Sequence, residues 1–95
     1  MQISCVVVET IKEGQVGAFV EHMREMVRLT KEEGGCIAYD MYEPLEGSNE
    51  VALVEIWEGM EALEIHQETD HFKNFVPSGD VFRAKPAVVR MFRKI

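Results

Sequence analysis

Three strand-like segments of this 95-residue chain are apolar on both of their faces, and this feature restricts the possible folds most strongly. Side chains alternate between the two faces of a β-strand, so a strand with one face in water alternates polar and apolar residues. Val6, Val7 and Val8 instead run together, and segments 51–56 and 87–92 are apolar at most positions. We therefore expect a sheet that is buried on both faces.

The hydrophobic period changes along the chain and indicates the order of the elements. Segments 2–11, 36–43, 51–57 and 86–93 are predicted strands, with Pro86 at the first position of the last one. Apolar residues at helical spacing predict a helix over 15–33, with Gly34 or Gly35 as a left-handed cap, and a second helix over 60–69. A further helical turn is expected over 71–76, followed by a loop over 77–80.

This βαββαβ order predicts an α+β fold of the ferredoxin-like type, with a four-stranded antiparallel sheet and both helices on one of its faces. Residues 1–95 are expected to form a single domain because the chain is short. The helices can cover only one face, and the other would expose a large apolar patch. The sequence therefore predicts a homodimer in which the uncovered sheet faces pack about a two-fold axis.

Composition restricts the partners. The net charge of −7 argues against nucleic acid as a partner, although the last thirteen residues hold five bases and no acid. We expect this basic segment to pair with acids of its own fold or of a second subunit, or to cap an anionic ligand. No apolar run has the length of a membrane span and no secretory signal is evident, so a cytoplasmic protein is expected. Cys5 and Cys36 lack metal-ligand spacing and are predicted to be buried, unpaired thiols.

Three titratable residues are candidates for acid/base chemistry. Glu55 lies in an otherwise apolar strand, where burial would raise its pKa, although it could instead reach solvent or pair with a base of the C-terminal segment. His66 lies on the helical stripe that should face the sheet, either as a core residue or as the acid/base group of a pocket. His71 follows about 140° further around an ideal helix, so the pair is not expected to chelate a metal. His22 is predicted at the surface.

Apolar residues of the predicted core are suited either to hold a flat apolar ligand or simply to pack. They are Phe19, Met23, Tyr39, Trp57 and Phe72. No phosphate-binding glycine loop, nucleophile elbow, zinc-protease motif or dinucleotide fingerprint occurs. The sequence therefore predicts no bound metal or cofactor.

The chain resembles the antibiotic biosynthesis monooxygenase family over nearly its whole length. The matching signals, in the family's order and spacing, are Gly14, the run 33–36 (EGGC) followed by Tyr39, the run 55–57 (EIW), the run 61–63 (EAL) leading to His66, and the run 69–72 (TDHF). The resemblance implies a ferredoxin-like fold, a dimeric α+β barrel formed by two sheets, and one pocket per subunit between sheet and helices. Members with different chemistries share this fold, so membership alone does not fix the reaction.

The leading hypothesis is a monooxygenase that oxidises a small aromatic hydroquinone, phenol or anthrone with O2, without metal or flavin, as in some members of the family. His66 would be the base, Glu55 or His71 would orient it, and the apolar residues above would hold the ring. The second hypothesis is an isomerase or other acid/base enzyme on a small carbonyl compound, with or without a phosphate group. Lys73, Arg83 or Arg90 near the pocket would favour it by binding a phosphate. The third is a non-catalytic dimer that binds a small ligand, in which His66 is structural.

Overall fold

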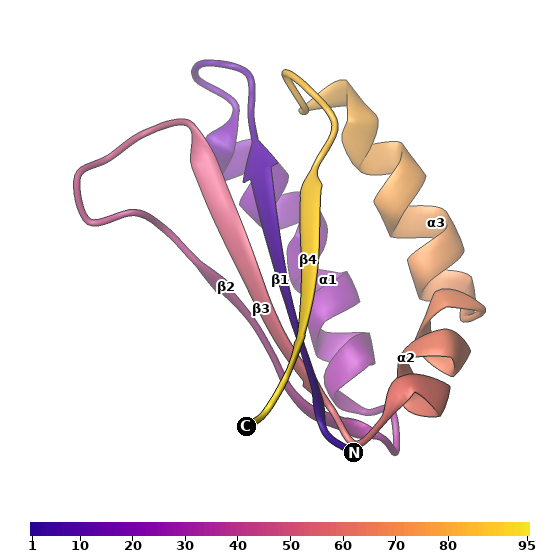
Figure 1. Cartoon of the computed structure of the whole chain (residues 1–95). Helices are drawn as coiled ribbons and strands as arrows, with labels where there is room; N and C mark the ends of the chain where they lie inside the picture. Colours follow the sequence, from indigo (N-terminus) through magenta and orange to yellow (C-terminus); the bar gives the residue numbers. More distant parts are fainter.

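The computed structural model describes residues 1–95 and contains four strands, three α-helices and one 3-10 turn. Along the chain they are β1 (Ile3–Thr10), α1 (Val16–Lys31), β2 (Cys36–Tyr42), β3 (Glu50–Trp57), α2 (Met60–Gln67), α3 (Asp70–Ser78), η1 (Gly79–Val81) and β4 (Val88–Arg93). The strands form one sheet in the order β2-β3-β1-β4, and every neighbouring pair is antiparallel. The helices gather on one side of this sheet (Figure 1). The predicted α+β, ferredoxin-like fold with a four-stranded antiparallel sheet is confirmed.

The helix-facing side of the sheet carries the core. On β3 every second residue is buried, namely Val51, Leu53, Glu55 and Trp57. The helix α1 packs against this side of the sheet with a stripe of buried residues three or four positions apart: Phe19, Met23, Met26 and Thr30. This spacing places one face of α1 against the sheet and leaves its charged residues outside.

The opposite side of the sheet is also apolar, as the strand pattern predicts. In the pairing register Val6 lies beside Val54, Val8 lies beside both Ala52 and Val88, and Phe92 lies beside Ser4. These side chains point away from the helices because their neighbours in sequence point toward them. Val88 and Phe92 retain 52% and 44% of their accessible surface. No helix covers this face of the sheet (Figure 1).

The end of α1 differs from the prediction. The helix stops at Lys31, its cap Glu32 is right-handed, and neither Gly34 nor Gly35 has a positive φ. The predicted left-handed cap is therefore wrong. Gly35 has a different role, because a Cβ at this position would collide with the Cβ of Ala62 on α2. The glycine lets α2 approach the turn between α1 and β2.

In the segment 60–80 the first helix is shorter than predicted and the second is longer. The first ends at Gln67, and Thr69 then caps α3, its hydroxyl oxygen accepting from the Phe72 N–H at 3.2 Å. The predicted loop over 77–80 is wrong, since α3 continues through Ser78 with Pro77 inside it and η1 follows. A proline at this position removes only one backbone N–H donor from the helix. The carbonyl groups of the last turn still accept hydrogen bonds, because the N–H of Gly79 donates to them.

Three smaller predictions also change. The last strand begins at Val88 and not at Pro86, which with Ala87 leads into the strand without pairing. His22 is half-buried, with its ring against Phe75 and Phe82, and is not a free surface residue. Cys5 is buried but Cys36 only partly so, and both are free thiols. None of the helices combines the length and the apolar character that crossing a bilayer requires.

Candidate active site

A cavity of about 270 Å3 lies between the helix-facing side of the sheet and α3. Eight apolar residues line it, namely Val7, Met23, Leu53, Phe72, Val76, Pro86, Ala87 and Val89. The polar lining comprises Glu9, Tyr39, Glu55, Asp80 and Arg83. An apolar pocket with a few convergent polar groups is the usual form of a small-molecule site, and this volume lies just below the typical range of roughly 300 to 1,000 Å3.

Glu55 is the principal titratable group of the cavity. It lies near the end of β3, opposite Cys5 on β1 and Tyr39 on β2, and only 5% of its surface is exposed. The indole N–H of Trp57 donates a hydrogen bond of 3.0 Å to Glu55 Oε1. Burial raises the pKa of this carboxyl to about 7, and the Trp57 hydrogen bond only partly offsets that effect. Of the two predictions for Glu55, the buried carboxyl with a raised pKa holds.

Tyr39 stands beside this carboxyl. Its ring is 2% exposed and meets Trp57 edge-on, with 6.4 Å between the ring centroids. Burial, and secondarily the negative charge of Glu55, raise the pKa of the phenol. Tyr39 is therefore a neutral phenol at physiological pH and can serve a ligand as a hydrogen-bond donor.

The other polar end of the cavity is an ion pair between β1 and the segment after η1. Arg83 Nε and Nη2 donate to the two carboxylate oxygens of Glu9 at 2.8 and 3.2 Å. Its Nη1 donates to the Val76 carbonyl at 2.8 Å and to Asp80 at 2.7 Å. The hydrogen bond to Glu9 is the main reason that the pKa of Arg83 is raised. The prediction that the basic C-terminal segment pairs with acids of its own fold is thus confirmed at Arg83.

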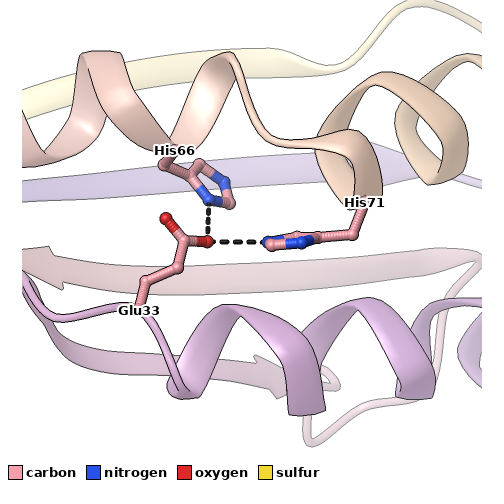
Figure 2. Close-up of side chains that lie close together, drawn as sticks. All are labelled: Glu33, His66 and His71. Carbon is pink, nitrogen blue, oxygen red and sulfur yellow. Dashed lines mark hydrogen bonds and ion pairs between the residues drawn. The ribbon is translucent and has the colours of Figure 1, made fainter.

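Behind the cavity wall, three side chains from three segments converge (Figure 2). Glu33 lies in the turn after α1, His66 on α2 and His71 in the first turn of α3. His66 Nδ1–H and His71 Nε2–H both donate to the same oxygen, Glu33 Oε2, at 2.7 Å. The angular argument that separated the two rings fails, because Glu68 and Thr69 divide the segment into two helices and each presents its own ring.

His66 is held as a neutral ring in an aromatic environment. Burial lowers its pKa more than the hydrogen bond to Glu33 raises it. Its ring lies 4.6 Å from that of Trp57, and Tyr39 and Phe72 complete the surroundings. His66 is 2% exposed and does not line the cavity, and it is connected to Glu55 indirectly, through the neighbouring Trp57.

The structure divides the predicted site residues into two groups. Glu55, Tyr39, Met23 and Phe72 line the cavity, whereas His66, His71, Trp57 and Phe19 stand outside its lining. Trp57 and Phe19 are fully buried core residues. Sequence reasoning missed Glu9 and Glu33, although Glu33 belongs to the family signal at 33–36 and its place beside two glycines marks a close approach of chain segments.

A family model described as "Antibiotic biosynthesis monooxygenase" matches residues 3–78. The chain belongs to this family. A solved structure of a conserved protein from Methanosarcina mazei Go1 superposes on all of this chain and 94% of that one, with a TM-score of 0.95 and 27% identity. Membership supports a monooxygenase-type role in general terms.

Two curated relatives match at a similar level of sequence identity. The uncharacterized protein sll1783 of Synechocystis is 28% identical over 83 residues. The matched region covers 87% of this chain but only 56% of that protein. YcnE of Bacillus subtilis, whose name describes it as a "putative monooxygenase", is 29% identical over 68 residues, which are 72% of each chain. Neither of these matches identifies a substrate, and the family match does not identify one either.

Proposed function

We propose that this family member is a monooxygenase of a small, electron-rich aromatic compound such as a hydroquinone, a phenol or an anthrone, with Glu55 as the base. The observation that carries the proposal is a carboxyl with a pKa of about 7 on the wall of an apolar cavity. Burial of an ionisable group costs stability, and such groups concentrate at functional sites. A base poised near neutral pH is best suited to take a phenolic proton.

The reaction proceeds in three steps on a hydroquinone. Glu55 removes a phenolic proton, and the aromatic anion, which is electron-rich, gives one electron to O2. The radical pair recombines with formation of a C–O bond, and cleavage of the O–O bond releases water, so that hydroquinone and O2 give a hydroxyquinone and H2O. Met23 and Phe72 hold the ring, Tyr39 donates to a ring oxygen, and the apolar walls exclude water from the anion. As the family resemblance implies, these steps use no flavin or metal.

The histidines have a supporting role in this mechanism. His66 packs on Trp57, and Trp57 donates to Glu55, so His66 positions the hydrogen bond that holds the base. The proposal therefore differs from the sequence-based hypothesis, in which His66 removes the proton and Glu55 or His71 orients it. Glu55 has the place on the cavity that a base requires, and His66 does not.

The charges around the cavity do not favour a phosphorylated substrate. Arg83 is the cationic residue of the lining, and Glu9 and Asp80 already neutralise it. Lys73 pairs with Glu68 and is 59% exposed, and Arg90 lies beside Val6 on the opposite side of the sheet. No observation therefore supports the isomerase hypothesis in its phosphate-binding form. The third hypothesis, a non-catalytic dimer that binds a small ligand, gives no role to the raised pKa of Glu55.

Oxygen uptake tests the proposal. EDTA-treated protein is assayed with a panel of hydroquinones, phenols and anthrones beside Glu55→Gln and the matched control Glu50→Gln, an exposed glutamate on the same strand. We expect uptake above autoxidation in the wild type and in Glu50→Gln, and a loss of roughly 100-fold or more in Glu55→Gln. Uptake that survives in Glu55→Gln but not in His66→Ala would return the role of base to His66. No uptake with any substrate would overturn the monooxygenase proposal in favour of ligand binding.

We also propose that the chain is a cytoplasmic homodimer joined through the uncovered sheet face. The face presents Val6, Val8, Val54, Val88 and Phe92 without a helix over them, and a second copy of the same face is the simplest cover. Light scattering at micromolar concentration is expected to give twice the chain mass, and Phe92→Asp to shift it toward the monomer. A wild-type monomer under these conditions would contradict the dimer.

A further inference from the structure

The cluster of Glu33, His66 and His71 has the composition of a transition-metal site. Two imidazoles and one carboxylate are the donor set of catalytic zinc sites and of the non-haem iron sites with two histidines and one carboxylate. The three donor atoms, Oε2, Nδ1 and Nε2, lie within 4.8 Å of one another. We propose that these residues bind one divalent transition-metal ion, of which Zn2+ is the representative.

The distances are close to what such an ion requires. Metal bonds of about 2.0 to 2.2 Å place neighbouring donor atoms about 2.9 to 3.4 Å apart, depending on the angle between them. In the structure Glu33 Oε2 lies 2.7 Å from each histidine nitrogen, so both pairs open by a few tenths of an ångström on binding. Both rings already direct a nitrogen toward Glu33 Oε2 (Figure 2), so binding requires the rings to turn slightly from this oxygen toward an ion beside it.

A second observation comes from the other oxygen of the carboxylate. Glu33 Oε1 is buried and has no hydrogen-bond partner. A buried acceptor without a partner costs roughly 1 to 3 kcal/mol, so the hydrogen-bonded arrangement leaves Glu33 incompletely satisfied. A metal ion held by both carboxylate oxygens would use this second oxygen as well.

The partial burial of the three side chains would allow an ion to enter from solvent and then be retained. The side chain of His66 is 2% exposed, whereas those of Glu33 and His71 are 13% and 15% exposed, which leaves an approach from solvent. Imidazole donors select zinc, iron, cobalt, nickel and copper over magnesium and calcium. The three ligands come from the turn after α1, from α2 and from α3, so the ion would fasten α3, a wall of the cavity, to the rest of the molecule.

Calorimetric titration of EDTA-treated, desalted protein with ZnCl2 tests this site, with Co2+ absorption as a second readout of coordination by nitrogen. The variants are Glu33→Gln, which keeps the size of the side chain, and His71→Ala. His22→Ala is the matched control, because His22 is half-buried against Phe75 but lies outside the cluster. Mg2+ is the control ion.

We expect one Zn2+ per chain, an affinity reduced roughly 100-fold or more in Glu33→Gln and His71→Ala, and unchanged binding in His22→Ala. Zn2+ is also expected to raise the thermal midpoint of the wild type and not that of Glu33→Gln. No Zn2+ binding by the wild type, or equal binding by the wild type and Glu33→Gln, would overturn the site and leave a hydrogen-bonded cluster. Oxygen uptake is assayed without metal, so either proposal can fail alone.

Discussion

Replacement of Glu55 by glutamine is expected to stabilise the protein while it lowers the proposed oxygen uptake roughly 100-fold or more. Glutamine has the size of the protonated carboxyl and can still accept the hydrogen bond from Trp57. Raising a carboxyl pKa from 4.5 to about 7 corresponds to about 3 kcal/mol, because each pH unit is worth about 1.4 kcal/mol. Since Glu55 is only 5% exposed, little of this penalty is lost to solvent screening. The glutamine variant should be more stable by up to about 3 kcal/mol at pH 8.

The pH dependence of this difference gives the sharper test. Between pH 4.5 and about 7 the unfolded chain has released the Glu55 proton while the folded chain retains it. The contribution of Glu55 to the free energy of unfolding therefore falls as the pH rises through this interval and is constant above it. Glutamine does not titrate, so the advantage of the variant should be small near pH 4.5 and should grow to its full value above pH 7.

Urea unfolding followed by the fluorescence of Trp57, the single tryptophan, measures this difference at several pH values and one fixed protein concentration. Glu9→Gln is the control, since Glu9 is also buried but is paired with Arg83. Weakening that pair is expected to destabilise the protein at pH 8, the opposite sign. A Glu55→Gln variant that is no more stable than the wild type at pH 8 would refute the reasoning from burial.

Three further predictions follow from other contacts. Gly35→Ala is expected to cost about 1 to 3 kcal/mol in urea unfolding, because its Cβ would collide with Ala62, whereas Gly34→Ala, which faces open space, should be close to neutral. Thr69→Ala removes the cap of α3 and should cost about 1 kcal/mol in the same assay, and equal stability would contradict the capping role. With Glu55 as base, kcat/KM should rise with pH through about 7, and a rate independent of pH between 5 and 9 would exclude that assignment.

The fold was predictable because local and global signals agree. The valines of β1 and the apolar segment of β3 predict a sheet buried on both faces, and the change of period between them predicts the helices. The inward position of Glu55 follows from the two-residue alternation along β3, since Leu53 and Trp57 are both core residues. The inward position of Met23 follows from the helical spacing of the apolar residues of α1.

The arrangement of the histidines was not predictable in this way. Glu33 lies 33 residues before His66 and 38 before His71, so only the tertiary approach of α2 and α3 to the turn after α1 brings them together. A single long helix would have kept the rings apart, whereas the chain breaks between α2 and α3, where the Thr69 side chain caps the second helix. The pairing of Glu9 with Arg83 spans 74 residues and has the same origin.

The cavity is divided between two parts of the chain in a way that bears on how substrate range could evolve. Glu55, which is the proposed base, and Tyr39, Met23 and Phe72 lie within residues 3–78, which the family model matches. Asp80, Arg83 and the wall over 86–89 lie beyond it. The chemistry and the shape of the opposite wall are thus encoded in separate stretches of sequence. Exchange of residues 79–89 between relatives would change which molecules fit while Glu55, the proposed base, stays in place.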